Sequence, residues 1–149
     1  MILSDKENHN ILIVDDVAEN VELLKYLLSS EGFNTFTASS AEEARLILVN
    51  TAIDVLLLDV NMPVQDGFSF CRELRSIDKY KLLPIIFITS IEREIGFEEA
   101  MRNGGDDFIN NFLNRPSHLN LGILLKIKRR TPLNNLLHPA LLQFCFKFH

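Results

Sequence analysis

The stretch Asn10-Ile11-Leu12-Ile13-Val14-Asp15-Asp16 decides the fold. Its four consecutive apolar residues are typical of a strand buried on both faces, as the strands of a parallel sheet are. Apolar residues then recur at spacings of three and four until Gly32, which predicts a helix that ends at this glycine. These residues are Val17, Val21, Leu24, Leu27 and Leu28. The chain therefore opens with a strand followed by a helix.

The same unit recurs along the chain up to about residue 110. Further strands are predicted at Thr35–Ala38, Ile53–Leu58, Pro84–Ile88 and Asp107–Asn110. Further helices are predicted after the capping box of Ser40 and Glu43, at Phe68–Ile77 and at Ile91–Arg102. Five such units predict right-handed crossovers and a doubly wound α/β fold, with a parallel sheet between helices on both faces. The functional site is expected at the carboxyl ends of the strands.

Length and composition limit the class of protein. A chain of 149 residues is the size of one domain, and 47% hydrophobic with 23% charged residues excludes wholesale disorder and a coiled coil. The net charge of −5 gives no support for a nucleic-acid partner. Neither a secretory signal nor an apolar run of membrane-spanning length is present, and two cysteines are too few for a disulfide framework. We therefore expect a cytoplasmic protein.

The charge distribution divides the chain near residue 108. Up to Asp107 there are 20 acidic and nine basic residues, a net charge of −11, whereas residues 108–149 hold six basic residues and no acidic one. We predict a domain over residues 8–130, in which the chain from residue 111 onward is the uncertain part. The fifth helix is predicted there, from Ser117 to Arg130. Its basic end is interpreted as a solvated helix terminus. Residues 131–149 are predicted to be a short hydrophobic tail, poorly ordered.

Acidic residues stand at the carboxyl ends of two predicted strands. Asp15 and Asp16 follow the first strand, and Asp59 follows the third. Two such charges about 4 Å apart repel by about 4 kcal/mol at an effective dielectric of 20, so a cluster of them is expected to hold a divalent cation. Carboxylates in small number suit Mg²⁺. In the alternative interpretation the acids lie apart, and Asp16 caps the following helix ahead of Glu19.

Five motifs, in this order, resemble the response-regulator receiver domain of two-component signalling. They are Ile11–Asp16, Leu56–Pro63, Gln65–Gly67, Phe87–Ser90 and Gly104–Phe108. The resemblance covers about two-thirds of the chain and implies a flavodoxin-like sheet with the strand order 2-1-3-4-5. It also implies that the loop before the third helix lies beside the site, where Gly67 would allow a turn.

The resemblance implies a role for each site residue. Asp59 would accept a phosphoryl group from the phosphohistidine of a sensor histidine kinase or a phosphotransfer protein. Thr89 would be the catalytic hydroxyl that contacts the phosphoryl oxygens, and Phe108 would change its rotamer as part of the switch. The ligands of Mg²⁺ would be Asp15, Asp16, Asp59 and the backbone carbonyl of Asn61.

The resemblance also implies partners. A downstream effector protein would bind the face formed by the fourth helix, the fifth strand and the fifth helix, and this face could form a dimer. The protein would catalyse its own phosphorylation and dephosphorylation instead of turning over a metabolite. No membrane and no direct nucleic-acid partner is expected.

The sequence departs from the family at the end of the fifth strand. The family has a lysine there, usually followed by a cis proline, whereas this chain has Asn111 and Phe112. The Asn111 amide is uncharged and shorter, so Mg²⁺ would carry more of the charge neutralisation. We expect phosphorylation to be possible and its coupling to conformational change, for which Asn111 is the second switch residue, to be weakened.

Several alternatives stay open at this point. A degenerate receiver would act as a phosphorylation-independent interaction module with its switch disabled at Asn111. The acid-free residues after Asn110 are either the family's fifth helix or an out-of-frame or truncated remnant of a longer protein. A hydrolase of the haloacid-dehalogenase type ranks lower because Asn61 stands at the second acidic position of its motif. A dinucleotide site is excluded because no glycine-rich fingerprint follows the first strand.

Overall fold

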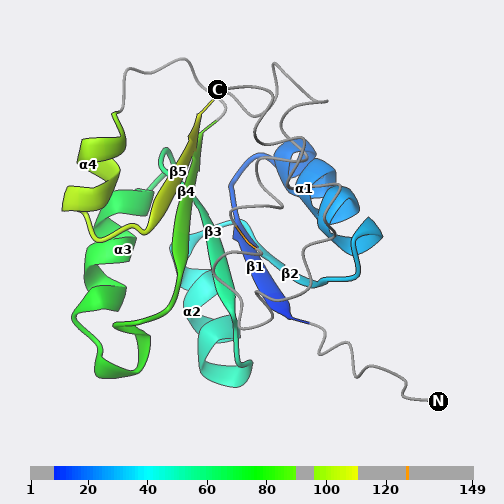
Figure 1. Cartoon of the computed structure of the whole chain (residues 1–149), viewed down its shortest axis with the longest axis horizontal. Coiled ribbons are helices and arrows are strands. Elements are labelled where there is room, and N and C mark those ends of the chain that lie inside the picture. Colours follow the sequence, from blue (N-terminus) through cyan, green and yellow to red (C-terminus); the bar gives the residue numbers. More distant parts are fainter. Residues whose placement is uncertain (1–8, 90–95, 111–126, 128–149) are drawn as a thin grey trace, which may run out of the picture.

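The structure is a computed structural model that describes residues 9–89, 96–110 and 127. Its centre is a parallel sheet of five strands in the order β2-β1-β3-β4-β5 (Figure 1). The strands are β1 (Asn10–Val14), β2 (Asn34–Ala38), β3 (Val55–Asp59), β4 (Ile85–Thr89) and β5 (Asp107–Asn110). Both the doubly wound fold class and the strand order predicted from the sequence are confirmed.

Helices cover both faces of the sheet. They are α1 (Ala18–Ser30), α2 (Ala41–Asn50), α3 (Gly67–Arg75), the short 3-10 helix η1 (Asp78–Tyr80) and α4 (Phe97–Arg102). In the described residues, α1 lies on one face and α2, α3 and α4 lie on the other (Figure 1). Each parallel connection therefore includes a helix that packs on a face of the sheet, as the sequence predicts.

The alternation of side chains along each strand divides the core into two layers. Ile11 and Ile13 of β1 pack on the side of α1, whereas Leu12 and Val14 pack on the side of α2, α3 and α4. All four side chains are fully buried. Burial on both faces explains why these strands read as continuous apolar runs, since each apolar side chain buried contributes about 1.5–3 kcal/mol.

Some element boundaries differ from the prediction. The third helix begins one residue early, at Gly67, because the Asp66 side chain accepts the Ser69 N–H at 2.8 Å as the N-cap. It ends at Arg75, before the predicted Ile77, and η1 follows. The predicted start of the fourth helix lies outside the described residues. So do the fifth helix, apart from the buried Ile127 on the α1 side, and the tail.

The amino edge of the sheet, which is the side where the parallel strands begin, is stabilised by hydrogen bonds to carboxylates. The Asp54 side chain accepts the backbone N–H of Asn10 at 2.7 Å, and the Asp106 side chain accepts that of Ile85 at 2.9 Å. Arg75, at the end of α3, donates to Asp106 at 3.0 Å. The same guanidinium donates to the backbone carbonyls of Gly104, Tyr80, Lys81 and Leu83. Arg75 therefore joins α3 to the starts of β4 and β5.

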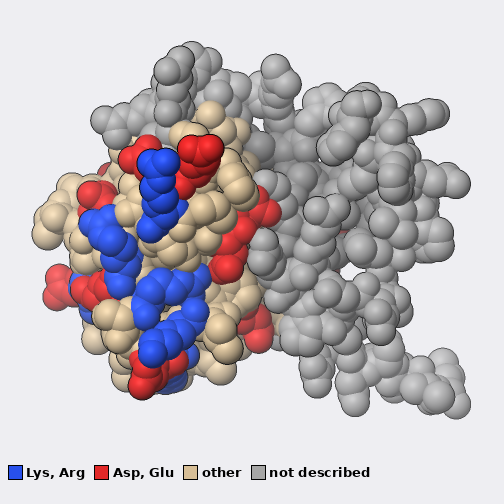
Figure 2. Space-filling model, turned by 60° about the vertical axis from the view of Figure 1, so that its left-hand side comes forward, with Lys and Arg blue, Asp and Glu red and all other residues tan. Residues whose placement is uncertain are grey.

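Charged side chains of both signs alternate on the outer surface of α3 and α4 (Figure 2). The ion pairs of the described residues on this side are Arg45 with Glu73, Arg75 with Asp106, Lys81 with Asp78, and Arg102 with Glu98. Such a surface has no extended field of a single sign. Within the part of the chain that the structure describes, no helix has the length and hydropathy needed to cross a bilayer.

Candidate functional site

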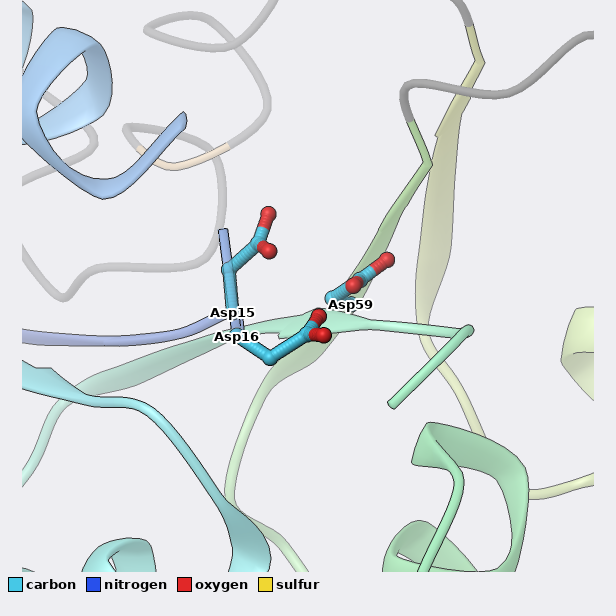
Figure 3. A group of neighbouring side chains, drawn as sticks. All are labelled: Asp15, Asp16 and Asp59. Atoms are coloured by element: carbon cyan, nitrogen blue, oxygen red, sulfur yellow. The ribbon is translucent and has the colours of Figure 1, made fainter. Parts of the chain in front are cut away.

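The three acids predicted to cluster do lie together at the carboxyl edge of the sheet. Asp15 and Asp16 directly follow β1, and Asp59 is the last residue of the neighbouring β3 (Figure 3). One carboxylate oxygen from each of the three lies within 4.8 Å of the others. Because parallel strands end at the same edge, residues 43 positions apart in sequence are brought together by the topology alone.

Asp15 is the deepest of the three carboxylates. It is 1% exposed, and it accepts the Val17 backbone N–H at 2.9 Å and the Asn20 side-chain amide at 3.0 Å. Burial raises the pKa of Asp15, and these two donors partly oppose that rise. The hydrogen bond to Val17 also corrects the capping alternative. The N-cap residue of α1 is Val17 without a side-chain cap, and Asp16 is left exposed at the cluster.

Asp59 has the most perturbed carboxyl group of the site. Its side chain is 6% exposed and accepts the Asn61 backbone N–H at 3.3 Å. Burial raises the pKa of Asp59 to about 8, with further contributions from the negative charges of Asp15 and Asp16. Without a cation, burial and mutual repulsion therefore disfavour joint ionisation of Asp15 and Asp59.

The donor set fits a small, hard divalent cation. Three carboxylates converge, two of them are buried, and mutual repulsion disfavours their joint ionisation. A cation held by these carboxylates would offset that repulsion and favour the ionised form of Asp59, and oxygen ligands of this kind suit Mg²⁺. Asp15, Asp16 and Asp59 could thus bind a metal ion.

The other predicted site residues take the following places. Thr89 is the last residue of β4, fully buried, one position beyond the register partner of Asp59. Phe108 lies in β5, paired with Phe87, and packs half-buried against the core on the α2 to α4 side. Asn61 is half-buried directly after β3. Asn111 lies outside the described residues.

The connection between β3 and α3 folds back over the site. The Gly67 N–H donates to the Val60 carbonyl at 2.9 Å, which closes the connection at its base. A Cβ atom added at Gly67 would lie 2.1 Å from the Asp59 carbonyl oxygen. Gly67 is thus required for close approach of α3 to Asp59. Gly67 is the first residue of α3, directly after this connection, and the residue of the connection with positive φ is Val64, at 69°.

A cavity of about 200 Å³ opens beside the acid cluster, between α1 and the end of β2. Its lining includes Asp15, Asp16, Val21, Thr37 and Glu43. The Glu43 carboxylate accepts the N–H and the hydroxyl of Ser39 at 2.9 and 3.0 Å, so it is held against the β2–α2 turn. The cavity gives solvent a path to the cluster from the α1 side.

Two groups of side chains at this site are not among the residues predicted from the sequence. Asn20 supports Asp15, and its signal is a polar residue four positions before Leu24 on the buried stripe of α1. Arg45 of α2 contacts Gln65 in the β3–α3 connection. No local pattern signals this contact, because its partners lie 20 residues apart on different elements.

The comparisons with known proteins agree with this geometry. The chain matches the response regulator receiver domain family over residues 11–117. It is 36% identical over 126 residues to the uncharacterized transcriptional regulatory protein YvcP of Bacillus subtilis, and 39% identical over 101 residues to the transcriptional regulatory protein CpxR of Klebsiella pneumoniae. These matches cover 83% and 68% of this chain and 50% and 42% of those proteins, so the chain spans about half their length.

A solved structure gives the same result. The signal receiver domain of a signal transduction histidine kinase from Syntrophus aciditrophicus is similar with a TM-score of 0.72 and 27% identity. The match covers 87% of this chain and 95% of that one. The family match spans more than half of the chain, and the sheet order and acid cluster are consistent with it. The chain belongs to the receiver domains of two-component response regulators.

Proposed function

We propose that this receiver domain accepts a phosphoryl group on Asp59 from the phosphohistidine of a histidine kinase or a phosphotransfer protein, with Mg²⁺ at the acid cluster. The observation that carries the proposal is the convergence of Asp15, Asp16 and Asp59 within 4.8 Å at the carboxyl edge. Three acids placed so closely destabilise the folded protein unless they bind a cation. Membership of the receiver family supports the same chemistry.

In the proposed transfer, a carboxylate oxygen of Asp59 attacks phosphorus, and the bond between phosphorus and the imidazole nitrogen breaks. The electron pair of that bond stays on the nitrogen, and the product is an acyl phosphate on Asp59. Phosphoryl transfer needs alignment and neutralisation of charge more than covalent work from the protein. The bound Mg²⁺ would neutralise part of the negative charge on the phosphoryl oxygens.

The residues of the chain would bind the cation, orient the Asp59 carboxylate and contact the phosphoryl group. Asp15 and Asp16, with Asp59 and the Asn61 carbonyl, would hold the cation. The Asn61 N–H, 3.3 Å from the Asp59 carboxylate, orients the acceptor. The Thr89 hydroxyl, at the end of the adjacent β4, would contact a phosphoryl oxygen, and the aromatic side chain of Phe108 would respond to its movement.

The proposed partners follow from this role. The donor is a sensor histidine kinase or a phosphotransfer protein, and the output is a downstream effector protein that binds through α4, β5 and the predicted fifth helix. Dimerisation through the same face is a further part of the proposal. We expect Asn111 to weaken the coupling between Asp59 and this face, because its amide brings no positive charge to the phosphoryl group.

The test is the intact mass of the protein before and after incubation with Mg²⁺ and acetyl phosphate. We expect the gain of one phosphoryl group, which a chelator prevents. Asp59→Ala and the isosteric Asp59→Asn should both abolish the gain. Asp66→Ala is the matched control, because it removes a nearby acid that caps α3 and costs about 1 kcal/mol of stability without touching the cluster.

Two outcomes would contradict the proposal. Persistence of the label in both Asp59 variants would show that another side chain is the acceptor. Absence of any label in folded wild-type protein that binds Mg²⁺ would exclude phosphoryl transfer, and would leave a phosphorylation-independent interaction module as the function.

A further inference from the structure

The Arg45 side chain of α2 contacts both α3 and the β3–α3 connection. Its Nε and Nη2 atoms donate to the two carboxylate oxygens of Glu73 at 2.7 and 2.9 Å. Nη2 also donates to the side-chain oxygen of Gln65. The guanidinium carbon lies 5.3 Å from the centre of the Phe70 ring. A planar, forked donor over an aromatic ring is held in one orientation more firmly than a single ion pair would hold it.

Gln65 is the point where this network reaches the connection. Its amide nitrogen lies 3.4 Å from the Ser69 hydroxyl and 3.5 Å from a Glu73 carboxylate oxygen, both on α3. Its oxygen accepts from Arg45. The side chain therefore has partners on two helices, and the backbone at residue 65 is fixed relative to both.

The connection needs such support because Val64, the residue before Gln65, has a strained backbone conformation. Val64 has a φ of 69°, and the Gln65 N–H donates to the Pro63 carbonyl at 2.8 Å across it, which makes a γ-turn. A β-branched residue in this region costs about 1–3 kcal/mol. The Val64 side chain is fully exposed, so no packing of its own compensates for the strain.

A shift of the connection would reach the acid cluster. Asn61 begins the connection and donates its N–H to the Asp59 carboxylate, and its carbonyl is the proposed fourth ligand. At the other end, Gly67 is bonded to Val60 and lies against the Asp59 carbonyl. Residues 61–66 thus form a short loop with both ends at Asp59, and Arg45 of α2 contacts this loop through Gln65.

We propose that Arg45 is a positioning residue for the metal site, acting through Gln65 on the loop of residues 61–66. The inference rests on the proposed function, since it assigns to α2 a part in forming the Mg²⁺ site. Removing the guanidinium lets the γ-turn relax, and the Asn61 carbonyl and Asp59 carboxylate then spend less time in the arrangement that binds the cation.

The first measurement is the Mg²⁺ dissociation constant by calorimetric titration. We expect Arg45→Ala to raise it about fivefold, at the low end of couplings between separate sites. Arg45→Lys should also raise it, because an ammonium group cannot make the forked contact. The matched control is Arg102→Ala, which removes another helix arginine paired with a glutamate at 3.5 Å, Glu98 on the exposed surface of α4. It should leave the constant unchanged.

The second measurement is amide hydrogen exchange in metal-free buffer. Arg45→Ala should speed exchange in the peptide that covers residues 60–67 and leave the peptides of β1 and β4 unchanged. Gln65→Met should reproduce both effects, and the double variant should be no worse than either single one, because both act through one contact.

The outcomes separate this inference from the proposed function. Wild-type affinity for Mg²⁺ in folded Arg45→Ala, or additive effects in the double variant, would overturn the role of Arg45 while leaving the metal site intact. Failure of the wild-type protein to bind Mg²⁺ would instead overturn the proposed function, and the inference with it. A fall in thermal stability alone, with unchanged affinity and exchange, would make Arg45 merely structural.

Discussion

The two edges of the sheet carry carboxylates in opposite surroundings. At the amino edge, Asp54 and Asp106 accept backbone N–H groups, and Arg75 pairs with Asp106. At the carboxyl edge, Asp15 and Asp59 are buried beside each other, and no arginine or lysine among the described residues forms an ion pair with them. The carboxylates of the amino edge therefore connect elements to one another. Those of the carboxyl edge repel one another, and a bound cation would reduce that repulsion.

The difference shows where stability and function are placed in this fold. The carboxyl edge carries the acid cluster and the strained Val64, both of which cost folding free energy. The amino edge is distant from the chemistry, and its carboxylates Asp54 and Asp106 accept hydrogen bonds from backbone N–H groups. A destabilising functional edge is tolerated because the opposite edge and the core hold the sheet together.

The largest expected effect comes from breaking the amino edge. Arg75→Ala removes five hydrogen bonds and leaves the Asp106 carboxylate without its cation, at a site where the arginine side chain is 20% exposed. We expect a loss of about 4 kcal/mol in the free energy of unfolding, measured by denaturant titration. Arg72→Ala, on the exposed side of the same helix, should cost less than about 1 kcal/mol. Equal losses in both variants would contradict the comparison.

The next effect comes from removing repulsion at the carboxyl edge. The pKa of Asp59 is about 8 in the folded protein and 3.8 in the unfolded reference, so the folded state binds the extra proton between these values. Stability therefore falls as the pH rises from about 4 to about 8, by 1.36 kcal/mol per unit of pKa difference at most. In metal-free buffer, Asp59→Asn should be more stable than wild type by about 3 kcal/mol near pH 8.

The control for this prediction is the pH dependence itself. The advantage of Asp59→Asn should shrink to nearly nothing at about pH 3, below the unfolded pKa of 3.8, where the carboxyl group is protonated in both states. Saturating Mg²⁺ should stabilise wild type and leave the variant nearly unchanged. An advantage that does not vary with pH would mean that the asparagine acts through packing instead of charge.

The smallest effect concerns the strained turn. Val64→Asn should raise the free energy of unfolding by about 1 kcal/mol, because asparagine tolerates positive φ better than a β-branched residue. The Val64 side chain is fully exposed, so the change removes no core contact. Thermal unfolding would check it, with Val49→Asn on the exposed surface of α2 as a control that has no strain to relieve. A loss of stability at Val64 would argue against stored strain.

Much of the fold could be predicted from residue patterns. The runs around Leu12 and Leu57 are apolar throughout because both faces of their strands are buried, and Ser40 caps α2 as its spacing to Glu43 indicates. The position of the acids at strand ends, combined with parallel topology, predicts the cluster. Element boundaries are less accurately predicted: the motif around Gly67 places Asp66 in a loop, and in the structure Asp66 is the N-cap of α3.

Other features had no local pattern to predict them. The contacts of Arg45 with Gln65 and Glu73, and those of Arg75 with Gly104 and Asp106, join residues that lie 20 to 31 positions apart. The requirement for glycine at position 67 arises from a backbone atom of Asp59, which no propensity reports. Contacts of this kind exist only once helices and strands have packed.

The sequence by itself determined which elements form and which chemistry is available, because periodicity, capping and the strand-end acids are local properties of the chain. Tertiary structure alone decided how strongly that chemistry is perturbed. The pKa of Asp59 rises to about 8 because packing buries its carboxyl group beside Asp15, and burial and distance are properties of the folded protein. The contact of Arg45 with the loop of residues 61–66 was decided in the same way, because it forms only when α2 packs beside α3.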